Sequence, residues 1–278
     1  MGMGMGIWTW VLLRLSVLSG ERLAFHGLGR DKSPLAVTAV AYGGAALFLW
    51  LAAAVLGEVR WQGEAFWPGS IYAVSFFLYT ASLGEGPVSL VSAFANATAV
   101  ILFLIQPVFD VWSLTGIGLF VLGALFLIPW GKKISRAVWW MLLSDGALAL
   151  GRILDAGVHG VRSLPYAASL FSSVVLWLIV PICLYGTWGE IWALARTRPT
   201  WGTAAAGANG LSYLTVFELL RVMPATLVEA VSAWSGVLAA GLGAVWFHEG
   251  ELVKKVLASA LMTLGTVILL FSQGARIG

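Results

Sequence analysis

Charged residues are scarce in this sequence. Only 10% of the 278 residues are Asp, Glu, Lys or Arg, whereas 60% are hydrophobic. A soluble domain of this size carries roughly 25% charged residues. Because so few charges cannot cover a surface that faces water, the sequence predicts that lipid is the solvent for most of the chain.

Cysteine and histidine are also nearly absent. The single cysteine, Cys183, excludes an intrachain disulfide and a cysteine-based metal site. The three histidines, His26, His159 and His248, lie far apart in the sequence. His248 is followed by Glu249, but the second histidine of the H-E-x-x-H zinc motif is missing. The sequence therefore predicts no enzyme activity and no cofactor.

The net charge is small as well. The excess of +3 is spread among the loops and does not indicate a nucleic-acid partner. The first residues lack a positively charged segment and a small-residue cleavage site, so we expect no cleavable signal peptide. The expected partners are the lipid bilayer and a small-molecule substrate, and the chain is expected to be a monomer or a homodimer.

Long apolar segments fill the sequence. A membrane-spanning helix needs about 20 residues, and we expect such helices at residues 7–28, 34–57, 66–83, 87–109, 112–130, 137–159, 165–187, 201–221, 224–247 and 252–272. The longest connection, residues 188–200, has the apolar spacing of a short helix in the interface plane. The prediction is an all-α membrane protein with ten transmembrane helices, multi-pass in the inner cell membrane.

The two halves of the sequence match each other at several helix starts. An offset of 131 residues pairs Trp8 with Trp139, Gly20 with Gly151, Leu23 with Leu154 and Pro34 with Pro165, and an offset of 137 pairs Pro87 with Pro224 and Val91 with Val228. Each half, residues 1–131 and 132–278, contains five predicted spans. Because five is odd, the second half must enter the membrane from the opposite side. The sequence thus predicts an inverted-topology repeat, an architecture found in many secondary transporters.

On these features the chain resembles the drug/metabolite transporter superfamily, in particular its ten-helix EamA-type members. The most similar stretch runs from Pro224 to Phe271, with a Pro-Ala opening, a long apolar helix, the turn His248-Glu249-Gly250-Glu251 and a helix that contains Gly265. The family's common Glu-Pro pair would fall near Ser235 and Gly236 and is missing. The resemblance implies export or exchange of small metabolites by alternating access, driven by an ion or substrate gradient.

Four ionisable residues stand out inside the predicted spans. Arg14 aligns with Asp145 in the repeat, and Glu21 aligns with Arg152. A charge at the bilayer centre costs about 2.5–3.5 kcal/mol on insertion scales, so such residues need partners or a wet cavity. Because the two halves run in opposite directions, the two acids share one depth and the two arginines share another.

We hypothesise that these residues line a central polar cavity with opposite charge at its two ends. Such a cavity suits a substrate with an amine and an acidic group, and the two acids are candidates for proton or sodium coupling. One alternative is a static salt-bridge lattice between the first and sixth spans. Another is that Arg152 pairs with Asp155, three residues further along the helix.

Other residues extend the candidate site. Glu229 lies five residues into its span, where an interfacial position and a cavity position are both open. Asn96 is a candidate polar residue of the cavity or an interhelical hydrogen-bonding group. The aromatic residues Trp8, Trp139, Tyr79, Tyr213 and Trp234 lie on the inferred core helices. They can form a wall for a cation or an apolar side chain, or they can serve in packing and interfacial anchoring.

The orientation in the membrane is predicted in two conflicting ways. Nine basic residues fall on the side of the first loop and four on the side of the termini, which favours both termini outside. The resemblance implies both termini in the cytoplasm. For function, the sequence favours a secondary active transporter of a small polar, amine-bearing or zwitterionic metabolite such as an amino acid. The alternative is a flippase for a lipid or a lipid-linked substrate.

Overall fold

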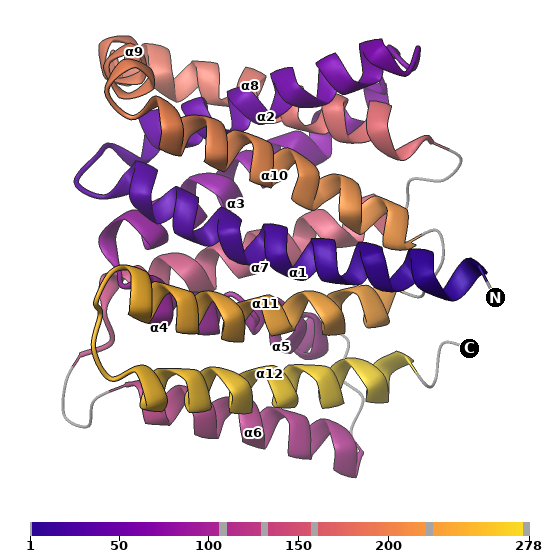
Figure 1. The fold of residues 1–278 in the computed structure, drawn as a ribbon, viewed down its shortest axis with the longest axis vertical. Helices are drawn as coiled ribbons and strands as arrows, with labels where there is room; N and C mark the ends of the chain where they lie inside the picture. Colours follow the sequence, from indigo (N-terminus) through magenta and orange to yellow (C-terminus); the bar gives the residue numbers. More distant parts are fainter. Residues whose placement is uncertain (1, 106–109, 129–132, 157–160, 221–224, 275–278) are drawn as a thin grey trace.

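The chain folds into a bundle of helices (Figure 1). The computed structural model describes residues 2–105, 110–128, 133–156, 161–220 and 225–274, and all regular elements within these ranges are helical. The elements are α1 (Gly2–Gly29), α2 (Pro34–Val55), η1 (Gly63–Ala65), α3 (Phe66–Glu85), α4 (Val88–Phe94), α5 (Ala97–Ile105), α6 (Val111–Leu127), α7 (Arg136–Ala156), α8 (Ser163–Tyr185), α9 (Trp188–Thr197), α10 (Pro199–Leu220), α11 (Ala225–Trp246) and α12 (Leu252–Gly274). The predicted all-α class is confirmed for these residues.

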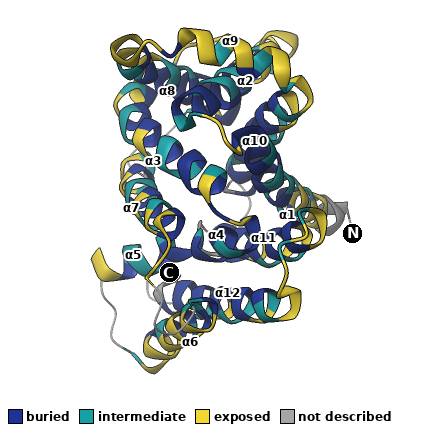
Figure 2. Cartoon of the chain, turned by 90° about the vertical axis from the view of Figure 1, so that its left-hand side faces the viewer, coloured by how far each residue is buried: buried dark blue, intermediate teal, exposed yellow. Residues whose placement is uncertain are grey.

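The outer surface of the bundle is apolar. Six spans within the described residues are long and apolar enough to cross a membrane. Large hydrophobic side chains such as Leu51, Val55 and Leu184 are more than half exposed. Figure 2 shows the exposed residues on the outward faces of the helices and the buried ones toward the interior. An apolar surface of this extent fits lipid rather than water as the solvent, so the chain is a multi-pass membrane protein.

Most helices are aligned with one common axis (Figure 1). The start of α1 and the end of α12 lie on the same side of the bundle (Figure 1). The main packing pairs are α6 with α12, α3 with α7, α1 with α10, and α2 with α8. Glycines allow the closest of these approaches. A Cβ atom on Gly116 would lie 2.7 Å from the carbonyl oxygen of Gly265, so the backbones of α6 and α12 meet directly there.

One predicted span is interrupted. The segment expected as one helix over residues 87–109 forms α4 and α5, with Ala95 and Asn96 between them. Asn96 Nδ2 donates to the carbonyl of Ala233, 3.2 Å away, and to the hydroxyl of Thr263, 3.1 Å away. These contacts hold the Asn96 side chain against α11 and α12, and the Thr266 hydroxyl bonds the Asn96 carbonyl at 3.5 Å. Because these partners are distant in the sequence, the apolar pattern alone did not predict the break.

Helix ends agree with the sequence at several points. Pro34 opens α2, where its missing N–H is harmless. The short helix expected at residues 188–200 is present as α9. The expected helix start at Pro224 lies outside the described residues.

Two side chains from elsewhere in the chain cap helix ends. Arg198 Nη1 donates to the carbonyls of Gly27, Leu28 and Arg30 at 2.9–3.2 Å, so it satisfies the C-terminal end of α1. Glu249 caps the N-terminal end of α4, where its carboxylate accepts a hydrogen bond of 2.6 Å from the backbone N–H of Val88.

Glu249 belongs to the turn between α11 and α12 but serves the start of α4. It also accepts bonds from the N–H and the hydroxyl of Ser89. Lys255 Nζ lies 3.9 Å from the Glu249 carboxylate and donates to the Glu249 carbonyl at 3.0 Å. Nearby, the His26 ring bonds the Leu83 carbonyl at 2.6 Å and packs on Phe247 with ring centroids 4.5 Å apart. This end of the bundle, where α1 ends and α4 begins, is therefore tightly packed.

Candidate functional site

A polar cavity lies inside the bundle. Its walls come from α1, α3, α5, α7, α10 and α11, together with one residue of α2, two of α12 and the break between α4 and α5. The cavity has a water-accessible volume of about 120 Å³. Six ionisable side chains other than tyrosine line it, namely Arg14, Glu21, Arg22, Asp145, Arg152 and Glu229.

The two acids predicted from the repeat, Glu21 and Asp145, are deeply buried. Their exposed fractions are 4% and 2%. Asp145 Oδ1 accepts a bond of 3.1 Å from Thr98, in the first turn of α5, and Glu21 Oε1 accepts a long bond of 3.4 Å from the Tyr79 hydroxyl. The second oxygen of each carboxylate is buried and has no hydrogen-bond partner among the described residues. Each acid therefore keeps one free acceptor at the cavity.

The two arginines predicted from the repeat lie at one level of the bundle. Arg14 donates to the carbonyl of Ser212 at 2.8 Å and to the hydroxyl of Ser232 at 3.0 Å. The guanidinium of Arg152 lies 5.9 Å from the ring centre of Tyr213, the neighbour of Ser212 on α10. The shared contact with α10 agrees with the predicted common depth of the arginines.

The sequence left an interfacial position and a cavity position open for Glu229, and in the structure Glu229 lines the cavity. Its carboxylate lies 3.5 Å from Arg152, and the two side chains are 35% and 19% exposed. Among the described residues this is the one ion pair that any of the four charges from the repeat forms. The expected alternative of a salt-bridge lattice between the first and sixth spans is therefore wrong, because Arg14 binds serines and Arg152 binds an acid of α11.

We call Arg14, Arg152 and Glu229 the outer end of the cavity, and Glu21, Arg22, Asp145 and Asn96 its inner end. Solvent reaches Arg152 and Glu229, whereas the acids of the inner end are almost fully buried. The packed end of the bundle around Glu249 lies beyond the inner end. The cavity is thus accessible from the side where α1 starts.

Asn96 stands at the break of the fourth span and lines the cavity. It is 6% exposed, and its amide is held by Ala233 and Thr263 as described above. A Cβ atom on Gly236 would lie only 3.0 Å from Asn96 Nδ2. The glycine of α11 therefore makes room for the break.

Sequence reasoning missed Arg22. This residue is 4% exposed, lines the cavity, and donates from Nη1 to the carbonyl of Ser92 at 3.0 Å. Its position is eight residues after Arg14, so helical spacing places it on the same face. The repeat did not reveal it, because the matching position in the second half is Ile153.

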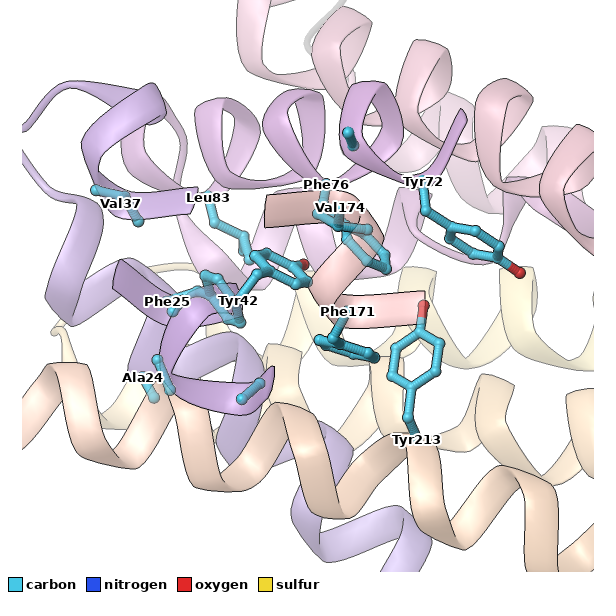
Figure 3. Close-up of a cluster of buried hydrophobic side chains, with 14 of the residues drawn as sticks. Ala24, Phe25, Val37, Tyr42, Tyr72, Phe76, Leu83, Phe171, Val174 and Tyr213 are labelled. Atoms are coloured by element: carbon cyan, nitrogen blue, oxygen red, sulfur yellow. The ribbon is translucent and has the colours of Figure 1, made fainter. Parts of the chain in front are cut away.

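Aromatic rings form one wall of the cavity. Of the aromatic residues predicted for the site, Tyr79 and Tyr213 line it, and Tyr42 and Phe76 join them. Tyr42 and Phe76 stack with ring centroids 4.1 Å apart, and Tyr213 meets Phe76 edge-on at 5.8 Å (Figure 3).

The three predicted tryptophans lie elsewhere. Trp8, Trp139 and Trp234 are 67%, 52% and 40% exposed and do not line the cavity. Their placement in an aromatic wall was wrong, because they occupy the outward faces of α1, α7 and α11. An amphipathic ring on such a face is suited to contact with lipid.

Asp155 has partners other than the expected Arg152. Its two oxygens accept hydrogen bonds from the hydroxyls of Tyr72 and Tyr166 at 2.5 and 2.6 Å. The prediction of an Arg152–Asp155 pair was wrong, since Arg152 reaches across to α11 instead. The carboxylate joins α7 to α3 and α8 next to the outer end of the cavity.

Comparison with known proteins identifies the fold alone. No family model matches the chain, and no curated protein matches it. The chain is similar to a solved structure described as "Crystal structure of protein", with a TM-score of 0.63 and 14% sequence identity over 98% of this chain and 99% of that chain. The likeness therefore extends over the whole bundle.

Proposed function

We propose that this protein is a secondary active transporter of a small polar, amine-bearing or zwitterionic metabolite, such as an amino acid, in the inner cell membrane. The observation that carries the proposal is the cavity, in which six ionisable side chains of both signs surround a broken helix. Buried charges within a membrane-spanning bundle are costly, and they mark substrate or ion pathways. Broken helices that line a cavity are likewise typical of transporter binding sites.

The proposal includes an inverted repeat of two five-helix halves, residues 1–131 and 132–278, in which α4 and α5 count as one span and α9 is additional. The helix contacts support it. If each helix is replaced by its counterpart in the other half, the pair α1–α10 becomes α7–α3, and the pair α10–α2 becomes α3–α8. All four pairs pack together. The pairs α2–α8 and α6–α12 convert into themselves and also pack. In Figure 1, α1 and α7 run in opposite directions.

Access from one side supports transport by alternating access. The outer end is partly exposed, and the inner end is closed by the packing around Glu249 and His26. A transporter must expose the same site to each side in turn, and a site that is open at one end only is the form expected for one of these states.

Glu21 and Asp145 are the proposed sites of proton or sodium coupling. Each has one buried carboxylate oxygen without a partner among the described residues. A buried carboxylate oxygen without a hydrogen-bond partner is costly, so a proton, a cation or a substrate amine stabilises it. Binding of the driving ion and of the substrate would then be linked at the inner end.

The test is a thermal-shift screen of the purified protein against amino acids, amines and nucleobases, followed by uptake into proteoliposomes. A ligand of the folded state raises the unfolding temperature by mass action. Uptake of a hit should rise at least severalfold with a proton or sodium gradient. Asp145→Asn and Glu21→Gln should remove this stimulation.

Glu58→Gln is the matched control, because Glu58 pairs with Arg162 and does not line the cavity. If Asp145→Asn and Glu21→Gln both keep the response to the gradient, coupling through these acids is wrong. If no water-soluble compound is bound or taken up, and a lipid copurifies with the protein, the transporter proposal fails in favour of a lipid flippase.

A further inference from the structure

The inner end of the cavity contains buried polar atoms that lack partners. Among the described residues, Glu21 Oε2, Asp145 Oδ2, Ser92 Oγ and Arg22 Nε make no hydrogen bond. The four side chains are at most 4% exposed. An unsatisfied buried polar group costs about 1–3 kcal/mol, and a charged one costs more. Both carboxylate acceptors and a guanidinium donor are unsatisfied, so one ligand that carries a cation and an anion together would satisfy all three.

Arg22 is the arginine that remains available for an anion. Arg14 is held by Ser212 and Ser232. Arg152 is neutralised by Glu229 at 3.5 Å. Arg22, in contrast, donates to the Ser92 carbonyl from Nη1 but leaves Nε without a partner among the described residues. The anionic group of a ligand is therefore better placed at Arg22 than at the outer end.

The spacing of the inner-end contacts limits the separation of the two ligand charges. Arg22 contacts Ser92, before the break, and Asp145 contacts Thr98, after it. These two positions flank the break, so Arg22 and Asp145 meet the α4–α5 segment on either side of Ala95 and Asn96. A ligand that bonds both side chains needs its two charges close together, and an ammonium and a carboxylate on the same carbon atom meet this condition.

The rest of the ligand would meet an apolar surface. Leu18, Leu102 and Leu148 line the cavity beside the stacked rings of Tyr42 and Phe76. A side chain that leaves the inner end toward the outer end would contact these groups.

We propose that the cavity binds a hydrophobic α-amino acid, with its carboxylate at Arg22, its ammonium at Asp145 and Glu21, and its side chain along the aromatic wall. This inference rests on the proposed transport function and specifies its substrate class. It also moves the acidic group of the substrate from the outer end, where the repeat suggested it, to a residue outside the repeat.

Four probes of similar size test the spacing of the charges. L-leucine carries both charges on one carbon, and its isomer 6-aminohexanoate carries them at opposite ends. 3-Methylbutylamine lacks the carboxylate, and 4-methylpentanoate lacks the ammonium. Titrated against the purified full chain in a thermal-shift assay, L-leucine should bind at least tenfold more tightly than each of the others. Equal or tighter binding of 6-aminohexanoate or of the amine would overturn the inference.

Substitutions then test Arg22. Arg22→Gln should weaken L-leucine at least tenfold and leave 3-methylbutylamine unchanged, and the retained amine binding shows that the variant is folded. Arg22→Lys should restore part of the preference for the amino acid. Arg162→Gln, at an arginine outside the cavity, should behave like the unmodified protein.

The outcomes separate this inference from the function on which it rests. If Arg14→Gln or Arg152→Gln removes the preference for L-leucine over the amine and Arg22→Gln does not, the assignment to Arg22 is wrong. If proteoliposomes take up the amine or 6-aminohexanoate but not L-leucine, the inference fails and the transporter proposal stands. If they take up no amine or amino acid of any kind, both fail.

Discussion

Replacing Glu249 with alanine should destabilise the protein far more than its place in a turn suggests. The carboxylate accepts two backbone N–H groups and a hydroxyl at the start of α4, and it lies 3.9 Å from Lys255. The side chains of Glu249 and Lys255 are only 8% and 11% exposed. Hydrogen bonds to a charged acceptor are worth about 1.5–3 kcal/mol each, and the contact with Lys255 contributes less, because 3.9 Å is beyond hydrogen-bond distance. We expect a loss of about 3–5 kcal/mol for Glu249→Ala, since the two contributions overlap.

Replacing Lys255, the other member of the ion pair, should lower the free energy of unfolding much less. Lys255→Met leaves Glu249 with its three donors and with the positive end of the α4 dipole, so we expect a loss of about 1–2 kcal/mol. Glu249→Gln keeps an acceptor oxygen and should fall between these two variants. Reversible unfolding in mixed micelles gives the free energies.

Amide hydrogen exchange gives a local measurement. Glu249→Ala should speed exchange at Val88 and Ser89, whereas Lys255→Met should change it little. If Lys255→Met costs as much as Glu249→Ala, the ion pair and not the cap dominates, and the reasoning is refuted.

Three further predictions concern other contacts of the bundle. Gly236→Ala places a Cβ 3.0 Å from the Asn96 amide, so ligand affinity in the thermal-shift titration should fall at least tenfold; unchanged affinity would show that the break is not part of the site. Asp155→Asn weakens two bonds from tyrosine hydroxyls at 2.5 and 2.6 Å and should lower the unfolding free energy by about 1.5–3 kcal/mol, because bonds to charged groups are worth that much; a loss below about 0.5 kcal/mol would contradict it. Arg198→Ala removes three bonds to the last carbonyls of α1 and should cost about 1–2 kcal/mol, with faster amide exchange confined to the C-terminal turn of α1; uniform exchange along α1 would argue against a capping role.

Much of the fold follows from composition and spacing. Apolar segments of membrane length predict the helices because each spanning helix must satisfy its own backbone hydrogen bonds. The break at Asn96 could not be predicted in this way, since α4 and α5 are as apolar as a continuous span. The bonds that hold the Asn96 side chain at the break come from α11 and α12, more than 130 residues away in the sequence.

The candidate site could be predicted where ionisable residues occupy matched positions of the two halves of the sequence. Arg14, Glu21, Asp145 and Arg152 stand at matched positions, and all four line the cavity. Arg22 has no counterpart in the second half, and only the helical face on which it lies could have indicated it.

Aromatic residues were the least predictable part of the site. A tryptophan side chain is suited both to contact with lipid and to contact with a ligand. Its position on a core helix does not distinguish these two roles. Trp139 and Tyr213 lie on comparable core helices, yet they are 52% and 9% exposed.

Under the proposed inverted repeat, the interruption at Asn96 makes the two halves of the protein unequal. The matching helix of the second half, α11, is continuous from Ala225 to Trp246. If the halves exchange conformations during transport, the inward-facing and outward-facing forms cannot be equivalent by symmetry, because one half has a break in a helix that is continuous in the other. The two forms then differ in energy even without a substrate, and the empty carrier would rest on one side of the membrane. Such a bias would set the side of the membrane that the empty site faces, whereas the direction of net transport would still follow the gradients of substrate and ion.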